Sequence, residues 1–241
     1  MPPCRFLLHL ELQWRWANST PIPHHLQPTR GFTGIPTQSA NPAGCTTVDF
    51  SSAGDTRNDI VSKLPCKNLT FLFARGTFEA GNIGSIVGPP MVTALIQRLG
   101  SAQVAVQGVN NYAADVAGFN AGGSDTGAQN MAGLIKSAIA QCPHTKLCVS
   151  GYSQGAQVVH KAVKLITGKE AAFINSVVLY GDPDDGQAVG AVPAGKVSTD
   201  CHLGDDICLG GNLILPPHLD YCLDAGVEAD FVVGKSGLVR V

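Results

Sequence analysis

One serine of the sequence stands in a pattern that can turn its hydroxyl into a nucleophile. The segment from Gly151 to Gly155 reads G-Y-S-Q-G and is the single match to G-x-S-x-G in the chain. It directly follows an apolar run at 146–150 and precedes a helix-like segment. In that context the two glycines permit a sharp turn, which lifts the serine hydroxyl to the N-terminus of a helix. The pattern predicts a nucleophile at Ser153, against the alternative of an ordinary glycine-rich turn with an N-capping serine.

Such a nucleophile needs a base, because a serine hydroxyl attacks only weakly on its own. Seven histidines are available. Five of them fall in the N-terminal segment, at the opposite end of the sheet, or too far along the helix that follows the serine: His9, His24, His25, His144 and His160. Of the remaining two, His202 and His218, the second follows two prolines in a loop before the last predicted helix. We predict that His218 is the base.

The acid that orients this base is expected between the serine and the histidine, because Ser…Asp…His is the chain order of α/β-hydrolase triads. Asp205 and Asp206 both lie there, in a short segment between two cysteines. If these cysteines are bridged, the closed loop would hold a carboxylate rigidly. Spacing alone does not choose between the two neighbours, and rival carboxylates follow the preceding predicted strand at Asp182, Asp184 and Asp185.

A zinc site is a second interpretation of the same region. Its ligands would be the cysteines and histidines of the C-terminal part, namely Cys201, His202, Cys208, His218 and Cys222. Structural zinc sites usually contain closely spaced C-x₂₋₄-C pairs, and this sequence has none. We therefore expect neither a metal nor another cofactor.

The elements that must position these residues alternate along the chain. Apolar runs predict strands at 69–74, 104–109, 146–150 and 176–180. Between and after them, amphipathic segments predict helices at 89–99, 124–141, 154–166 and 226–239. Apolar strands separated by helices indicate a parallel sheet that is covered by helices on both faces. The sequence therefore predicts an α/β fold.

Composition and charge limit the class of protein. The chain has 241 residues, of which 44% are hydrophobic and 14% charged, and its formal net charge is -2. This charge offers no basic surface for nucleic acid, and without an apolar run of 18 residues we expect no membrane span. Residues 1–45 are rich in Pro, Thr, Ser and Gly, which predicts a disordered leader or linker. We expect one catalytic domain at 46–241.

The cysteine content indicates the compartment. Eight cysteines suggest an oxidising environment, because cytosolic thiols are kept reduced. The leader itself is an atypical signal peptide, since His9, Glu11 and Arg15 interrupt its apolar run. Two sequons, at Asn18 and Asn68, permit glycosylation. The expectation of a secreted, extracellular protein therefore rests on the cysteines.

Residues 66–235 resemble fungal cutinases, the small serine esterases of the cutinase and acetylxylan esterase family. Several segments carry the resemblance in the right order: 73–82, 107–109 with Tyr112, Cys142-Pro143, the G-Y-S-Q-G segment, Gly204-Asp205 between its cysteines, and 217–219. The resemblance implies a small α/β-hydrolase fold without a lid. It also implies a monomeric enzyme that hydrolyses carboxylic esters.

The same resemblance implies roles for five residues. The family motif C-x-x-G-D-x-x-C places the acid at Asp205, and its Pro-His pair places the base at His218, with Ser153 as the nucleophile. The oxyanion hole would use the backbone N–H of Gln154 and the backbone N–H and hydroxyl of Thr77.

Two disulfides are implied in the same way, Cys66–Cys142 and Cys201–Cys208. The other four cysteines depart from the family pattern: Cys4, Cys45, Cys148 and Cys222.

Aliphatic residues near the base predict the substrate. By resemblance they form the lips of an apolar groove that suits acyl chains, although each could also be a core residue: Val116, Leu213, Ile214, Leu215 and Leu219. Such a groove suits acyl chains better than sugar rings, so we expect a polyester or small ester substrate, with cutin or a similar aliphatic polyester as the leading choice. Two alternatives remain, an acetylxylan esterase and a catalytically inactive hydrolase fold that serves as a surface or elicitor protein.

Overall fold

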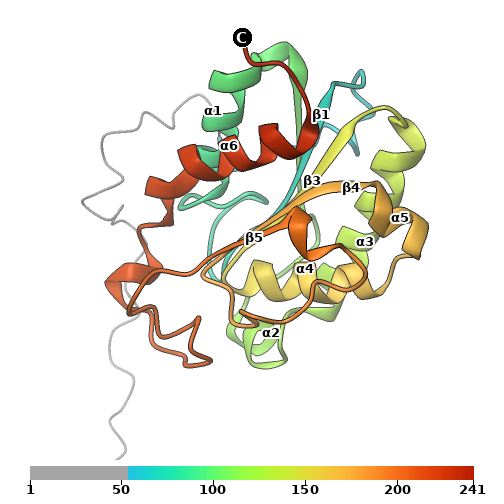
Figure 1. Ribbon diagram of the computed structural model, residues 1–241. Helices are drawn as coiled ribbons and strands as arrows, with labels where there is room; N and C mark the ends of the chain where they lie inside the picture. The colour runs from blue at the N-terminus through green and yellow to red at the C-terminus, as the bar shows by residue number, and fades with distance from the viewer. Residues whose placement is uncertain (1–53) are drawn as a thin grey trace, which may run out of the picture. The chain divides into compact units, whose positions relative to one another are not determined.

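The structure is a computed structural model that describes residues 54–241. The leader expected at 1–45 lies outside these residues. Within the described part, five strands form one parallel sheet in the order β2-β1-β3-β4-β5 (Figure 1). The strands are β1 (Leu69–Ala74), β2 (Val104–Gly108), β3 (Lys146–Tyr152), β4 (Ile174–Tyr180) and β5 (Val197–Asp200). Because parallel strands end at the same edge, the loops that follow them meet there, where α/β proteins bind ligands.

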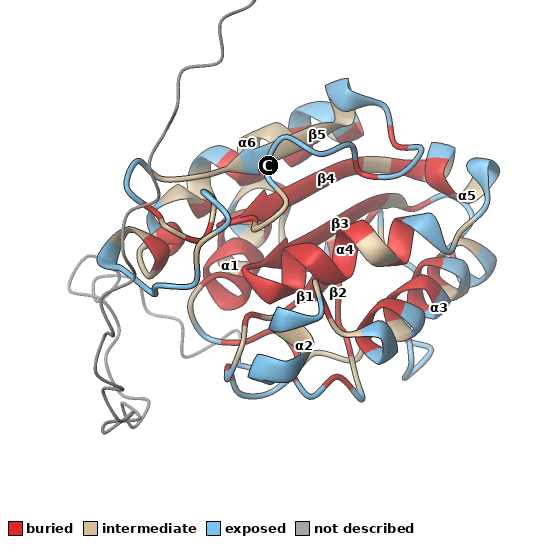
Figure 2. Ribbon diagram, turned by 90° about the horizontal axis from the view of Figure 1, so that it is seen from below, coloured by how far each residue is buried: buried red, intermediate tan, exposed pale blue. Residues whose placement is uncertain are grey.

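Helices cover both faces of the sheet, as predicted (Figures 1 and 2). The first face packs on α1 (Gly88–Leu99) and α6 (Ala225–Ser236), and the second on α3 (Asp125–Gln141), α4 (Gln154–Lys164) and α5 (Gly168–Phe173). Side chains alternate along each strand. In β1, Phe71 and Phe73 join the cluster under α1 and α6, while Leu72 and Ala74 join the other cluster. Both faces are therefore apolar, which explains the continuous apolar run.

The four predicted strands and four predicted helices are present, with ends that differ by a few residues. The last helix was expected to reach residue 239, but α6 ends at Ser236, because Gly237 adopts a left-handed conformation with φ 68°. Three elements were not predicted: α2 (Val116–Asn120), α5 and β5. They are short, and β5 is partly exposed with the sequence VSTD, so neither an apolar run nor a helical period marks it.

Two disulfides join described residues. Cys66–Cys142 connects the segment before β1 to the end of α3, and Cys201–Cys208 closes a short loop after β5. These are the pairings that the resemblance implied. Cys222 is also disulfide-bonded, and Cys148 is a free thiol buried in β3. Among the described helices, none has the length and apolar character that crossing a bilayer requires.

Candidate active site

Ser153 occupies the turn between β3 and α4 in a conformation that few residues adopt. Its φ of 56° and ψ of -123° lie outside the favoured regions, and its N–H donates to the carbonyl of Tyr180 at 2.9 Å. The flanking glycines are required, because a Cβ on Gly155 would collide with the backbone of Ala74 and one on Gly151 with the backbone of Gly155. The turn therefore holds the Ser153 side chain at the carboxyl edge of the sheet.

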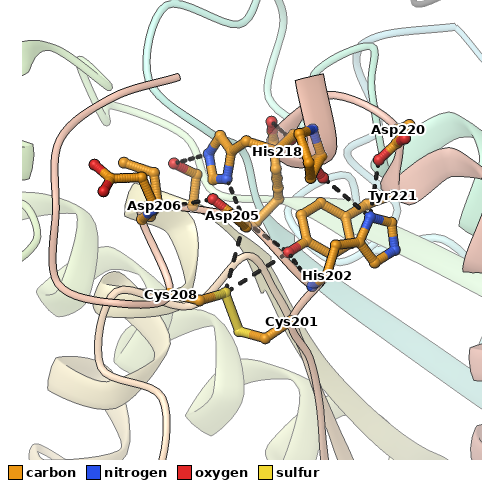
Figure 3. Close-up of polar contacts among 12 residues, drawn as sticks. Cys201, His202, Asp205, Asp206, Cys208, His218, Asp220 and Tyr221 are labelled. Atoms are coloured by element: carbon orange, nitrogen blue, oxygen red, sulfur yellow. Dashed lines mark hydrogen bonds and ion pairs between the residues drawn. A yellow bond between two sulfur atoms is a disulfide. The ribbon is translucent and has the colours of Figure 1, made fainter. Parts of the chain in front are cut away.

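The structure brings together the three residues expected to form a triad. The Oγ of Ser153 lies 2.9 Å from Nε2 of His218. Nδ1 of His218 lies 2.8 Å from Oδ2 of Asp205 (Figure 3). All three are buried, with exposed fractions of 4%, 1% and 1%. This chain of hydrogen bonds has the geometry that lets an imidazole accept a serine proton while a carboxylate orients it.

The rival carboxylates face other partners. Asp206 accepts the N–H of Leu213 at 2.9 Å, and Asp182 pairs with the buried His160 at 2.8 Å. Asp184 donates its N–H to Asp182. Of the five aspartates considered, Asp205 is the one that contacts His218.

Asp205 is held by the short loop that the Cys201–Cys208 disulfide closes. Its N–H donates to the carbonyl of His202 at 3.0 Å, and its Oδ1 accepts the N–H of Ile207 at 3.0 Å. Gly204 precedes it with φ 89°, a left-handed conformation that separates the directions of the loop's side chains. The disulfide also excludes the zinc interpretation, since the sulfurs of Cys201 and Cys208 are bonded to each other.

His218 follows two prolines in a 3₁₀ turn, Pro216–His218, between the disulfide loop and α6. Burial lowers the pKa of its imidazole, although the hydrogen bond and the charge of Asp205 act in the opposite direction. Its ring packs against Gly181, where a Cβ would lie 2.8 Å from Cε1 of the imidazole. The lowered pKa favours the neutral imidazole, which is the form that can accept a proton.

Two tyrosines contact the triad and were missed in the sequence. The hydroxyl of Tyr152 donates to the backbone carbonyl of His218 at 2.6 Å, and that of Tyr221 donates to Oδ2 of Asp205 at 2.7 Å. Both are buried. Their closeness in sequence to Ser153 and His218 was the available signal, because a buried tyrosine hydroxyl usually has a polar partner.

Thr77, which the resemblance assigns to the oxyanion hole, contacts the first residue of α4. The amide Nε2 of Gln154 donates to Oγ1 of Thr77 at 2.8 Å and to the carbonyl of Asp115 at 2.6 Å. The loop of Thr77 is fixed by Glu79, a buried carboxylate that accepts the N–H groups of Gly76, Ser85 and Ile86, each at 2.8 Å. Sequence reasoning did not single out Glu79.

Most of the aliphatic residues expected at the substrate are on the surface. Four of the five are exposed, with exposed fractions of 37–58%, namely Val116, Leu213, Ile214 and Leu215. Leu219, which directly follows His218, is half-buried. The alternative that these residues belong to the core is therefore wrong for the four exposed side chains.

Comparison with known proteins identifies the family. The family model described as Cutinase matches residues 65–236. The chain is 49% identical to a cutinase of Botryotinia fuckeliana, over 72% of this chain and 85% of that one, and 46% identical to a cutinase of Monilinia fructicola, over 71% and 85%.

Solved structures agree with this assignment. A Trichoderma reesei cutinase in complex with a phosphonate inhibitor is similar with a TM-score of 0.72 and 42% identity, over 80% of this chain and 85% of that one. The catalytic core of an acetyl xylan esterase from Trichoderma reesei has a TM-score of 0.59 at 21% identity, over 71% and 100%, and so shares the fold. The chain therefore belongs to the cutinase family, whose members are serine esterases that hydrolyse carboxylic ester bonds.

Proposed function

We propose that the protein cleaves esters with Ser153 as nucleophile, His218 as base and Asp205 as the orienting acid. The observation that carries the proposal is the continuous pair of hydrogen bonds from Ser153 through His218 to Asp205. Nε2 of His218 takes the serine proton as Oγ attacks the ester carbonyl, and Asp205 stabilises the imidazolium that forms. His218 then protonates the leaving alcohol, and a water molecule releases the acyl group by the same steps.

The oxyanion formed in each step would be held at the N-terminus of α4. The backbone N–H of Gln154 belongs to the first turn of that helix, where N–H groups lack helical partners. Thr77 would supply a second N–H and its hydroxyl. The hydrogen bond from the Gln154 side chain orients this hydroxyl before substrate arrives, which supports the proposed role. Each preorganised donor of this kind typically contributes about 3 kcal/mol to lowering the barrier.

The substrate class follows from the exposed aliphatic side chains. Val116 begins α2, and Leu213, Ile214 and Leu215 lie in the loop that leads to His218. Asp115, which precedes Val116, accepts a hydrogen bond from Gln154, and Leu215 is three residues before His218. Exposed apolar side chains close to the triad favour acyl chains over sugar rings. We therefore propose cutin or a similar aliphatic polyester as the substrate, hydrolysed by a monomer with an open site. An acetylxylan esterase would prefer acetyl groups.

We also propose that the protein acts outside the cell, with residues 1–45 preceding a single catalytic domain. Two disulfides between described residues support this, because such bonds form and persist in oxidising compartments.

A series of p-nitrophenyl esters of increasing acyl length tests both the chemistry and the substrate class. We expect kcat/KM to be higher for butyrate and longer chains than for acetate. Ser153→Ala is the matched control and should lose about 10,000-fold or more in kcat. A preference for acetate would replace the polyester proposal with the acetylxylan esterase. A folded wild-type protein without activity would favour the inactive alternative.

A further inference from the structure

The carboxylate of Asp205 has a second side-chain partner besides His218. Its Oδ2 accepts the hydroxyl of Tyr221 at 2.7 Å, next to Nδ1 of His218 at 2.8 Å (Figure 3). Tyr221 is completely buried. Its hydroxyl has one proton, which it gives to the carboxylate, and its oxygen accepts the N–H of His202 at 2.9 Å. The hydroxyl therefore donates one hydrogen bond to Asp205 and accepts another from the backbone of the disulfide loop.

The ring of Tyr221 is confined on several sides. The imidazole of His202 stacks on it with 4.0 Å between centroids and 28° between planes. Tyr152 and Tyr180 meet it edge-on at 6.1 Å, and a Cβ on Gly181 would lie 2.9 Å from its Cε2. The ring therefore has little freedom to carry its hydroxyl away from Asp205.

Both ring nitrogens of His202 face hydrogen-bond acceptors. Nδ1 lies 2.8 Å from Oδ1 of Asp220 and 3.0 Å from the carbonyl of Pro217, and Nε2 lies 2.7 Å from Oδ2 of Asp224. Asp200 adds a third carboxylate at 3.9 Å. Partial burial lowers the pKa of His202, but the hydrogen bonds to Asp224 and Asp220 outweigh it and the pKa is raised. Acceptors at both nitrogens favour the imidazolium, the form in which both nitrogens donate.

We infer that Tyr221 is a positioning residue for Asp205, and that His202 acts through Tyr221 by fixing its ring. A carboxylate rotates easily about its last side-chain bond, because that torsion has a broad preference. Here Ile207 holds Oδ1 and Tyr221 holds Oδ2. Together they keep one lone pair of Oδ2 directed at His218. The inference rests on the proposed role of Asp205 in orienting the base.

The variant Tyr221→Phe removes the hydroxyl and keeps the ring. We expect kcat to fall about tenfold, since hydrogen bonds to charged groups are among the stronger ones, while KM stays within about twofold. Thr70→Val is the control, because it removes a buried hydroxyl that pairs with Thr145 at 2.9 Å near the start of β1, away from the triad. It should keep the wild-type kcat.

A pH profile separates positioning from a general loss of folded protein. The Tyr221 hydroxyl partly neutralises the charge of Asp205 by donating a hydrogen bond to it. In Tyr221→Phe the full charge acts on His218, so the pKa of His218, measured from the fall of kcat/KM at low pH, should rise. If the variant only reduced the amount of folded protein, activity would fall while the pH midpoint of kcat/KM stayed the same.

A double-mutant cycle tests whether His202 works through Tyr221. His202→Gln alone should lower kcat about threefold. In the Tyr221→Phe background it should cause no further loss, because the ring no longer carries the hydroxyl to Asp205. If the double variant instead lost kcat by the product of the two single losses, His202 would not act through Tyr221.

The outcomes distinguish this inference from the proposed function. If wild-type protein is active and Tyr221→Phe keeps its kcat and its pH profile, Tyr221 does not position Asp205. If Ser153→Ala retains wild-type activity, the proposed function fails instead. Circular dichroism of each variant confirms that the measured protein is folded.

Discussion

Two histidines lie on either side of Tyr221, and their surroundings give them opposite properties. His218 has one carboxylate partner, and its second nitrogen faces the hydroxyl of Ser153. His202 has carboxylates at both nitrogens. Burial therefore dominates at His218 and lowers its pKa, whereas hydrogen bonds to acids dominate at His202 and raise its pKa.

This difference separates a base from a structural cation. A histidine can accept a proton from a nucleophile only if it is neutral and one nitrogen faces the proton donor. His218 faces the serine hydroxyl and has a lowered pKa, whereas His202 faces carboxylates at both nitrogens and has a raised pKa. An adjacent carboxylate alone is thus insufficient to recognise a base, as the buried pair of His160 and Asp182 also shows, since it has the same 2.8 Å separation without a serine.

The largest expected effect comes from exchanging each histidine for glutamine. His218→Gln should lower kcat by about 10,000-fold, because no neighbouring group can replace the base. His202→Gln should stay within about tenfold of the wild type, since this residue does not face the serine. Kinetics on one p-nitrophenyl ester measure both. Equal losses of kcat in the two variants would contradict the distinction between His218 as base and His202 as a structural residue.

A smaller effect is expected in the pH dependence of the wild type. The base must be neutral, so kcat/KM should fall about tenfold per pH unit below the pKa of His218 and level off above it. Because burial lowers this pKa, the midpoint should lie below 6.5, the ordinary value for histidine. His202→Gln should show nearly the same midpoint. A midpoint above 6.5, or a rate that is flat from pH 5 to 8, would contradict His218 as the base.

The smallest effect concerns stability. A raised pKa at His202 means that the folded state binds a proton more tightly than the unfolded state. This stabilisation is complete below about pH 6.5 and is lost as the pH rises through the higher folded value. Asp200, whose pKa burial and the charge of Asp224 raise to about 6, contributes with the same sign at lower pH.

The measurement is the difference in Tm between the wild type and His202→Gln across pH. This difference should be largest near pH 6 and should shrink toward pH 9. The contribution of His218 to the pH dependence of Tm drops out of this difference, because both proteins retain that residue. A difference that grows with pH would show that His202 is neutral in the folded protein.

Sequence reasoning reached the nucleophile and the base for physical reasons. Two glycines, Gly151 and Gly155, mark the turn that Ser153 requires. Elimination left His202 and His218, and the two prolines in the loop before the last predicted helix favoured His218. The choice of Asp205 over Asp206 needed the family motif. These neighbours differ in direction, and direction depends on the left-handed Gly204 and on the partner that each carboxylate finds in space.

The contacts around Tyr221 could not be predicted. They join the loop after β5 to the segment before α6, and β5 itself has no apolar pattern. His202 was considered as a base or a zinc ligand in the sequence, yet its role depends on Asp220 and Asp224, which only the folded chain places at its two nitrogens.

The oxidation state of the Cys201–Cys208 disulfide affects how firmly the acid of the triad is held. It closes the loop that presents Asp205, and it does so over a sequence separation of 7 residues. A newly made, reduced chain would lack this covalent closure, and hydrogen bonds alone would hold the loop that carries the acid. For the proposed extracellular role, oxidation of this pair would complete the loop that presents the acid, so that full activity would require an oxidising compartment.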